Sequence, residues 1–510
     1  MKYFKSIFAL FFISFSVLNA QNAPTMQWQK IIGGLATSSL NELCQDIQQT
    51  SDGGYIFAGT ENDTPLTTTG NFAVIKLNSL GNIQWQKSLG GNLTDRAYSI
   101  RPTTDGGYIV AGETASNDGD VTGNHGGIDF WVVKLSSLGN IEWQKTFGGN
   151  LTDIARSVQQ TSDGGYIIAG ETSSTNGDVI GNHGSFDYWV IKTDSSGNIQ
   201  WQKTLGGTAD DRAYEIQQTT DNGYVIAGYT SSNNGDVSGN HGTTDYWIVK
   251  LGSTGDLQWQ KALGGTAADR AHAIRQSADG GYFVAGTTFS TNGDITVNYG
   301  LSDYWIVKLT ATGDIQWQKS FGNSLRENAH GIDATADGGC IVTGEKYGIP
   351  QEGSTSGTAY PDYWVIKLNA AGIVEWQETY GGSLSDISTC IQQTSDGGYI
   401  IGGYSHQGNN TAFDFWIIKL AASQLSSQEN KFETKISIYP NPAKDFVNLT
   451  NLPKESTVTV YNSAGRKIFS EKYSQTNISI DTSSFVNGLY FIQIESSEKG
   501  IISEKLIISK

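Results

Sequence analysis

Asp187-Tyr-Trp-Val-Ile-Lys192, a short turn and Ile199-Gln-Trp-Gln-Lys203 close a unit of about 58 residues that recurs along this chain. A Trp-Gln pair ends each copy, at Trp28, Trp85, Trp143, Trp201, Trp259, Trp317 and Trp376. An Asp-Gly-Gly-Tyr turn or a close variant marks the middle, at Asp52, Asp105, Asp163, Asp221, Asp279, Asp337 and Asp396. Seven copies indicate one repeated supersecondary unit. Residues present in every copy are expected to serve the scaffold, and chemistry is expected where the copies differ.

The third copy predicts four short antiparallel strands. Ala155–Thr161 is followed by an Asp-Gly turn, typical of a tight hairpin, and by a second strand, Tyr166–Gly170. A long loop leads to Asp187–Lys192, and a second turn leads to Ile199–Lys203. Four short strands per unit are typical of a propeller blade.

The two ends of the repeat region complement one another. Met26–Lys30 is a fourth strand without the preceding three, and Phe415–Leu420 is a third strand without a fourth. We therefore predict an all-β fold in which residues 21–420 form a seven-bladed β-propeller of four-stranded blades, with the N-terminal strand closing the last blade. This clasp removes exposed sheet edges. The long loops fall on the face opposite the short hairpins, and we expect a binding site there because loops on rigid scaffolds carry most sites.

One short motif resembles a known repeat. Asp194-Ser-Ser-Gly-Asn-Ile-Gln-Trp201 resembles the Trp-docking repeat of quinoprotein-like propellers, in which a Gly precedes a Trp by four residues. The resemblance covers about eight residues per blade and implies architecture rather than activity. Quinoprotein dehydrogenases carry adjacent cysteines at their site, and this sequence has none.

Two polar positions recur in every third strand. A lysine occurs at Lys76, Lys134, Lys192, Lys250, Lys308, Lys367 and Lys419. An Asp or Asn begins the strand at Asn71, Asp129, Asp187, Asp245, Asp303, Asp362 and Asp414. They could form a charged ring around the axis or serve as turn caps and interblade pairs. We expect the structural role, because one substrate rarely uses seven equivalent positions.

The long loops of copies two to four are close copies of Asn176-Gly-Asp-Val-Ile-Gly-Asn-His183, and copy five is related. Three interpretations stay open. Calcium could bind the oxygens of Asp118, Asp120, Asp178, Asp236 and Asp294, although no Glu closes the loop as in an EF-hand. Sugar hydroxyls could hydrogen-bond to Asn124, His125, Asn182, His183, Asn240 and His241. Alternatively, Asp and Asn cap the turns locally and His packs on the next blade. No other cofactor is predicted.

Composition limits the partners. The 510 residues carry a net charge of −17 and 16% charged residues. Nucleic acid is excluded because its phosphates need a basic surface, and anionic membrane surfaces are disfavoured for the same reason. The sequence contains no Gly-x-Ser-x-Gly elbow and no His-Glu-x-x-His motif. Catalysis would therefore depend on unpatterned residues, for example around Glu345 to Asp362.

The N-terminus predicts a secretory signal peptide, residues 1–20. Lys2 and Lys5 precede an apolar run, Ile7–Leu18, and Ala20 precedes a plausible cleavage site. The apolar run is too short to span a bilayer comfortably. Later segments are less apolar, so no membrane span is predicted in the mature chain.

The three cysteines are Cys44, Cys340 and Cys390. Cys44 and Cys390 fall in the first strands of copies one and seven, which are neighbours in a closed ring. A disulfide between them and buried free thiols both stay open. The odd, sparse set is no disulfide framework and favours free thiols.

The composition changes after Leu420. Residues 421–433 are Ser/Gln-rich and predict a linker. Residues 434–510 contain no copy of the repeat, and their alternating short strands predict a small Ig-like β-sandwich.

This module carries Tyr439-Pro-Asn-Pro442, the turn Asn462-Ser-Ala-Gly465, Gly488-Leu-Tyr490 and the tail Lys505-Leu-Ile-Ile-Ser-Lys510. On these residues it resembles the type A C-terminal sorting domain of the Bacteroidetes type IX secretion system. The resemblance implies sorting-signal roles for Tyr439, Pro440, Asn441, Pro442, Gly488, Tyr490, Lys505, Leu506 and Lys510. It also implies the type IX machinery as a partner, and a secreted or outer-membrane-surface location after signal-peptide export.

Together the two modules resemble exported Bacteroidetes repeat propellers, a group that supplies an address and a fold but no substrate. We expect a secreted or cell-surface binding or adhesion scaffold whose ligand is a glycan or a protein. The alternative is a polysaccharide-active enzyme, a lyase or hydrolase, with its site on the long-loop face. That alternative requires a deep central pocket with a perturbed carboxylate.

Overall fold

The computed structural model describes residues 23–33, 41–63, 70–348, 360–406, 412–422, 436–462, 466–496 and 500–510. The chain divides into two compact units, Met1–Ser423 and Gln424–Lys510. The predicted signal peptide and the predicted linker beyond Ala422 lie outside the described residues. Among the described residues, no helix is long and apolar enough to cross a membrane.

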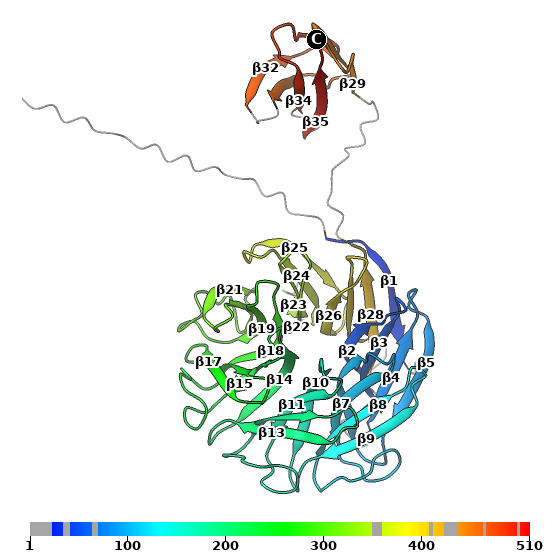
Figure 1. The fold of residues 1–510 in the computed structure, drawn as a ribbon, viewed down its shortest axis with the longest axis vertical. Coiled ribbons are helices and arrows are strands. Elements are labelled where there is room, and N and C mark those ends of the chain that lie inside the picture. Colours follow the sequence, from blue (N-terminus) through cyan, green and yellow to red (C-terminus); the bar gives the residue numbers. More distant parts are fainter. Residues whose placement is uncertain are drawn as a thin grey trace, which may run out of the picture. The chain divides into compact units, whose positions relative to one another are not determined.

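The first unit is a ring of seven four-stranded antiparallel sheets within the described part of the chain (Figure 1). Blades 1 to 3 comprise β2 (Asn41–Gln49), β3 (Tyr55–Asp63), β4 (Asn71–Leu77) and β5 (Ile83–Leu89); β6 (Asp95–Pro102), β7 (Tyr108–Thr114), β8 (Asp129–Leu135) and β9 (Ile141–Phe147); and β10 (Asp153–Gln160), β11 (Tyr166–Thr172), β12 (Asp187–Thr193) and β13 (Ile199–Leu205).

Blades 4 to 6 comprise β14 (Asp211–Gln218), β15 (Tyr224–Thr230), β16 (Asp245–Leu251) and β17 (Leu257–Leu263); β18 (Asp269–Gln276), β19 (Tyr282–Thr288), β20 (Asp303–Leu309) and β21 (Ile315–Phe321); and β22 (Glu327–Ala334), β23 (Cys340–Tyr347), β24 (Pro361–Leu368) and β25 (Val374–Tyr380). Blade 7 comprises β26 (Asp386–Gln393), β27 (Tyr399–His406), β28 (Phe413–Leu420) and β1 (Met26–Ile32).

The ring closes through the N-terminal strand. β1 pairs antiparallel with β28, from Met26 opposite Leu420 to Ile32 opposite Phe415. The first strands lie near the centre of the ring in Figure 1, and each contacts the first strands of both neighbouring blades, including β2 with β26. The predicted seven-bladed propeller with its N-terminal clasp is therefore confirmed.

The Trp-docking motif joins successive blades. The ring of Trp201, in the fourth strand β13 of blade 3, lies over the last turn of blade 4. A Cβ on Gly255 of that turn would meet the ring at 3.1 Å. Trp201 also makes an edge-on contact with Tyr224 of that blade, with ring centroids 5.7 Å apart. Five further Trp–Gly pairs repeat this contact: Trp28–Gly81, Trp85–Gly139, Trp143–Gly197, Trp259–Gly313 and Trp317–Gly372. The repeated Gly is required because it combines a positive φ with this close approach.

A second interblade contact runs through the third strands. Tyr188 of blade 3 packs against Trp247 of blade 4 with ring centroids 4.4 Å apart. Its hydroxyl donates to the Trp247 carbonyl at 2.8 Å. Both rings are fully buried. Equivalent aromatic pairs join the other blades: Phe72–Trp131, Phe130–Trp189, Tyr246–Trp305, Tyr304–Trp364 and Tyr363–Trp416.

The recurring lysines point into their own blades. Lys192 is buried, and its Nζ lies 2.8 Å from Asp163 of the hairpin turn and donates to the Thr193 carbonyl at 2.9 Å. The same Lys–turn Asp pair occurs in all seven blades. Burial acts to raise the pKa of Asp163, but hydrogen bonds from Lys192, Thr161 and the Gly165 amide outweigh it and lower this pKa to about 2. The lysines thus stabilise the hairpin turns, in agreement with the structural role that we expected from the sequence.

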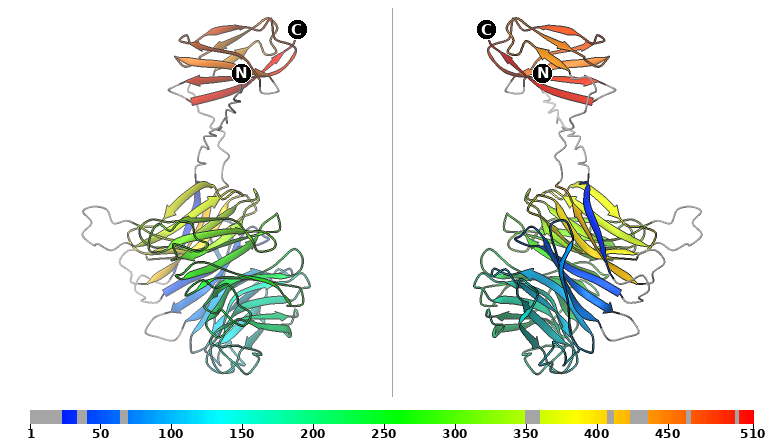
Figure 2. Two further views of the ribbon diagram at one scale, coloured as in Figure 1. Left: turned by 90° about the vertical axis from the view of Figure 1, so that its left-hand side faces the viewer. Right: turned by 90° about the vertical axis from the view of Figure 1, so that its right-hand side faces the viewer.

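The second unit is a sandwich of two sheets, seen as facing layers in Figure 2. One sheet has the order β29-β30-β33 and the other β32-β31-β34-β35. Side chains of both sheets share one apolar core, which includes Val447, Ile480, Val460, Ile492 and Leu506. The strands are β29 (Ser437–Tyr439), β30 (Phe446–Thr450), β31 (Ser456–Asn462), β32 (Lys467–Tyr473), β33 (Ile478–Asp481), β34 (Gly488–Ser496) and β35 (Gly500–Ile508). The predicted small sandwich is confirmed.

The Trp–Gly contact predicts a selective effect of one methyl group. Gly255→Ala adds a Cβ 3.1 Å from the Trp201 ring, at a residue with φ of +83°. We expect a loss of about 2–4 kcal/mol in unfolding free energy, from the left-handed backbone and from overpacking. Gly280→Ala is the matched control, because its φ is +84° and its added Cβ meets nothing within 4 Å. Equal losses in denaturant unfolding would show that the Trp contact contributes nothing.

The Lys–Asp pair predicts a stability difference that depends on pH. Lys192→Met removes the charge that helps hold the pKa of Asp163 at about 2, below its usual 3.8. The wild-type advantage should be full above pH 4 and vanish as pH falls towards 2, because the depressed folded pKa stabilises only the ionised carboxylate. The difference should be on the order of 1 kcal/mol, because Asp163 is half exposed and water screens the pair. Urea unfolding of both proteins from pH 2 to 7 measures it, and a difference independent of pH would contradict the ion pair.

Candidate functional site

The asparagines of the long loops form hydrogen bonds within their own turns. Asn182 accepts a hydrogen bond from the Gly184 amide at 2.9 Å, and its Nδ2 donates to the Ser174 carbonyl at 3.0 Å. Asn124 and Asn240 make the corresponding contacts in blades 2 and 4. Both ends of each amide are therefore used within the loop.

The loop histidines are held by the aspartate that begins the third strand. His183 Nδ1 lies 2.8 Å from Asp187 Oδ2, and the His183 backbone amide donates to the same oxygen at 2.7 Å. His125 and His241 repeat this arrangement with Asp129 and Asp245. The three imidazoles keep 36–44% of their surface exposed.

The loop aspartates accept hydrogen bonds from the backbone that links two blades. Asp178 Oδ2 accepts from the Gly148 amide at 3.3 Å, and Asp236 and Asp294 accept from Gly206 and Gly264. Asp120 accepts from Gly90, and Asp118 accepts from the Asn92 backbone and side chain. Among the described residues no three His, Cys, Asp or Glu side chains are grouped to hold a metal ion. These contacts match the turn-capping interpretation, and the calcium and sugar interpretations stay predictions.

The predicted sorting-signal residues divide into two sets. Leu506 and Tyr490 are buried in the sandwich core, and the Tyr490 hydroxyl donates to the Val486 carbonyl at 3.0 Å. Asn441 bridges to β35, donating to the Lys505 carbonyl at 2.7 Å and accepting from the Ile507 amide at 2.9 Å. The exposed set comprises Tyr439, Pro440, Asn441, Pro442, Gly488, Lys505 and Lys510. Residues 463–465 of the Asn462 turn lie outside the described residues.

The structure places a different set of side chains on the propeller axis. In every blade the first strand has a register shift at its fourth position, or at its fifth in β2, so that one residue bulges out of the ladder. Such bulges commonly re-aim a side chain near a functional site. The bulged residues, which we call the axial ring, are Gln45, Tyr98, Arg156, Tyr214, His272, His330 and Thr389. All seven line one cavity of about 410 Å³ and are half-buried.

Aromatic and cationic groups alternate along one side of the axial ring. The Arg156 guanidinium lies 4.3 Å from the Tyr98 ring centroid and 5.7 Å from that of Tyr214. Tyr214 meets His272 edge-on at 5.2 Å, and His272 stacks on His330 at 5.3 Å. The ring therefore offers flat faces and polar edges to the same space.

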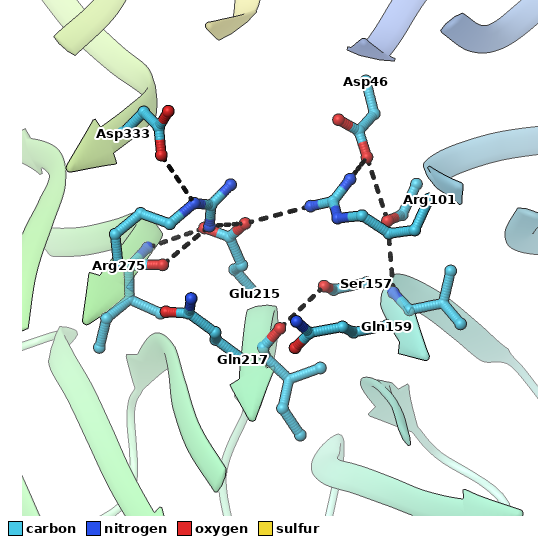
Figure 3. Close-up of polar contacts among 12 residues, drawn as sticks. Asp46, Arg101, Ser157, Gln159, Glu215, Gln217, Arg275 and Asp333 are labelled. Atoms are coloured by element: carbon cyan, nitrogen blue, oxygen red, sulfur yellow. Dashed lines mark hydrogen bonds and ion pairs between the residues drawn. The ribbon is translucent and has the colours of Figure 1, made fainter. Parts of the chain in front are cut away.

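A chain of ion pairs, which we call the floor, crosses the axis (Figure 3), and four of its five members, Asp46, Arg101, Glu215 and Arg275, line the cavity. Arg101 bonds Asp46, and its second nitrogen lies 3.6 Å from Glu215. Arg275 bonds the same Glu215 and lies 3.6 Å from Asp333. These five side chains come from blades 1, 2, 4, 5 and 6 and so span the axis. Arg101 and Arg275 also line a second cavity of about 240 Å³, so the chain divides the axial space in two.

Burial sets the charge state of the axial ring. It lowers the pKa of His272 to about 3 and that of His330 to about 4, so both imidazoles are neutral at physiological pH. His272 Nδ1 lies 2.8 Å from the Ala329 carbonyl and must carry the proton, which leaves Nε2 as an acceptor. Burial also raises the pKa of Tyr214, so its hydroxyl keeps its proton.

All three arginines that line the cavity have carboxylate partners. Arg101 and Arg275 belong to the floor, and Arg156 donates to the buried Glu171 at 2.8 Å. The floor contains the carboxylates of Asp46, Glu215 and Asp333 and the guanidinium groups of Arg101 and Arg275. Each of the three guanidinium groups that line the cavity is thus already paired with a carboxylate.

The prediction of the site from sequence missed the axial ring. It directed attention to the long loops, where near-identical copies are conspicuous. The signal that could have revealed it is variation between the copies. When the seven first strands are aligned on the Asp-Gly-Gly turn, the residue at the bulge varies, whereas the neighbouring apolar residues stay small or branched. That position, which holds Gln, Tyr, Arg, Tyr, His, His and Thr in turn, was a place where the copies differ.

Comparison with known proteins identifies the second unit. Residues 437–509 match the family described as the secretion system C-terminal sorting domain. Over 227 residues, 40% of this chain and 23% of the relative, the chain is 24% identical to the regulatory protein FlaEY of Caulobacter vibrioides. It is 34% identical to beta-agarase A of Zobellia galactanivorans over 85 residues, 16% of each chain. The chain thus spans less than a quarter of the length of these curated relatives.

Among solved structures, Sqt1 from Chaetomium thermophilum is similar with a TM-score of 0.41 and 10% sequence identity, over 75% of this chain and 86% of that one.

The sorting domain determines where this protein is located. The C-terminal unit is a type IX secretion sorting domain, and the chain that carries it is exported to be secreted or held at the cell surface.

Proposed function

We propose that this exported propeller is a binding or adhesion scaffold that takes an uncharged glycan in the axial cavity. The observation that carries the proposal is the axial ring: seven half-buried side chains that differ between otherwise repeated blades converge on one cavity. A role limited to the scaffold would not require Tyr, Arg and His at positions that other blades fill with Gln or Thr.

The size and chemistry of the cavity support this ligand class. Its 410 Å³ lie within the usual range of about 300–1,000 Å³ for small-molecule sites. Tyr98 and Tyr214 provide flat rings for the apolar face of a sugar, and Gln45, Thr389 and the neutral His330 provide hydrogen bonds to hydroxyls. Paired arginines leave little attraction for uronic or sulfated sugars.

The long-loop residues would form the outer part of such a site. The exposed edges of His125, His183 and His241 remain candidates for sugar contacts, and the Asn-Gly-Asp loops remain candidates for calcium. A protein ligand on the same face is the other form of the binding proposal.

A polysaccharide lyase or hydrolase is the second candidate. One observation favours it: burial raises the pKa of Glu345, whose Oε1 lies 4.0 Å from Nε2 of His330 beside the cavity. Glycoside hydrolysis generally needs two carboxylates free to reach the substrate. Here Asp46 and Glu215 are held by Arg101 and Arg275, so binding without turnover is the better-supported proposal.

Loss of one aromatic face should weaken glycan binding. Tyr214→Ala in the mature protein should reduce affinity for a neutral oligosaccharide about tenfold, which corresponds to about 1.4 kcal/mol of stacking. Tyr214→Phe should retain most of the affinity because it keeps the ring. A glycan array identifies the ligand, and titration calorimetry measures the affinity.

Leu138→Ala is the control for this test, because Leu138 is exposed in the turn between β8 and β9, outside the cavity and the long loops. Unchanged binding in Tyr214→Ala, or a preference for acidic glycans, would contradict the proposed axial site. Loss of binding in EDTA, reproduced by Asp178→Asn, would instead support calcium in the loops. Release of reducing sugars that Glu345→Gln abolishes would establish the enzyme.

The sorting domain makes a separate prediction. Deletion of residues 434–510 should leave the propeller in the periplasm, because the signal peptide alone directs transfer across the inner membrane only. Fractionation and immunoblotting should find the intact protein outside the cell and the truncated one inside. Equal amounts of both proteins in the medium would show that the domain is dispensable for export.

A further inference from the structure

Two of the three cysteines meet at the junction where the ring closes. Cys44 lies in β2 of blade 1, and Cys390 lies in β26 of blade 7. Both are buried free thiols in this structure, and both belong to the apolar cluster that joins blades 1 and 7. Thr389, beside Cys390, donates to the Cys44 carbonyl at 2.8 Å, which fixes the two strands side by side.

The two sulfur atoms share one small space beside Gly402 of β27. A Cβ built on Gly402 would lie 2.8 Å from Cys390 Sγ and 2.9 Å from Cys44 Sγ. The two sulfurs are therefore no farther apart than the sum of these distances. Burial raises the pKa of Cys44 well above its usual value, and its hydrogen bond with Cys390 raises it further.

Comparison between blades shows that this space is specific to the closing junction. The residue opposite the first position after the bulge is Gly402 in blade 7, and elsewhere it is Ala58, Ala111, Ala169, Ala227, Ala285 or Thr343. The position of Cys44 is taken in the other blades by Ala97, Ala155, Ala213, Ala271, Ala329 and Ser388. Three departures from the repeat thus coincide at one place, and the missing methyl group of Gly402 makes room for two sulfurs.

We propose that Cys44 and Cys390 form a disulfide that fastens blade 1 to blade 7 after export. Each thiol loses one proton and one electron, and one S–S bond forms. The two electrons and two protons pass to an oxidant of the thiol–disulfide oxidoreductase class, whose own disulfide becomes a dithiol. The reaction proceeds through a mixed disulfide with one cysteine, which the other cysteine resolves.

The location and timing of this reaction follow from the structure. The sorting domain places the protein in compartments where disulfides persist. Because both thiols are buried in the closed ring, the oxidant must react before blades 1 and 7 meet. The bond would then constrain the unfolded chain across nearly the whole propeller, at the junction that strand pairing by β1 otherwise holds.

Thiol counting on the exported protein tests the proposal directly. The protein collected from the cell surface or medium is alkylated with iodoacetamide in denaturant, without and with prior reduction. We expect one modified cysteine, Cys340, before reduction and three afterwards, with a Cys44–Cys390 linked peptide in the unreduced digest. Three modified cysteines before reduction, or a linkage that includes Cys340, would overturn the proposal.

Thermal unfolding provides the second measurement. Reductant should lower the Tm of the wild type by roughly 5 °C or more. The Cys44→Ala/Cys390→Ala variant should be insensitive to reductant, whereas Cys340→Ala, the buried-thiol control, should keep the full shift. A wild-type Tm that reductant leaves unchanged would count against the bond, and the thiol count decides the matter even if a variant fails to fold.

Discussion

The contact between neighbouring blades is the constraint on which the whole propeller depends. A four-stranded blade exposes two faces and cannot bury either alone, so stability must come from stacking. Trp201 over the turn at Gly255, and Tyr188 against Trp247, are two forms of this contact. Six Trp–Gly contacts and six aromatic pairs join successive blades in the described part of the chain, and the contact between Trp28 and Gly81 joins blade 7 to blade 1. The packing between blades 7 and 1 therefore requires that β1 closes the ring.

The same constraint separates scaffold from site. Positions that face a neighbouring blade, such as the Trp–Gly pairs and the buried lysines, recur because every junction has the same geometry. Positions that face the axis meet no such demand, since one side chain can differ from the next without disturbing a junction. The bulge in each first strand turns one residue towards the axis. The residue types therefore vary most at the axial positions, where a ligand could bind.

The ion-paired floor determines how charge is distributed in the axial cavity. Arg101 and Arg275 bridge carboxylates from blades that are far apart in sequence. Buried charges of this kind are costly unless paired, and the alternation of signs satisfies each one. Above these ion pairs the cavity is lined by tyrosine, histidine, glutamine and threonine side chains and by Arg156, which is paired with Glu171. The cavity is therefore polar, and the charged groups that line it are paired with one another.

The sequence alone determined the repeat, the blade count, the clasp at Met26–Ile32 and the nature of the C-terminal unit, because strand periodicity, turn chemistry and short motifs are local signals. It also located Cys44 and Cys390 at one junction. Only the tertiary structure decided what the loop residues do: Asn182 and Asp178 are used by their own turns and links. It alone assembled the axial ring, because residues about 58 positions apart become neighbours only when the ring closes. Spacing along a chain does not reveal which side chain a bulge will turn inward.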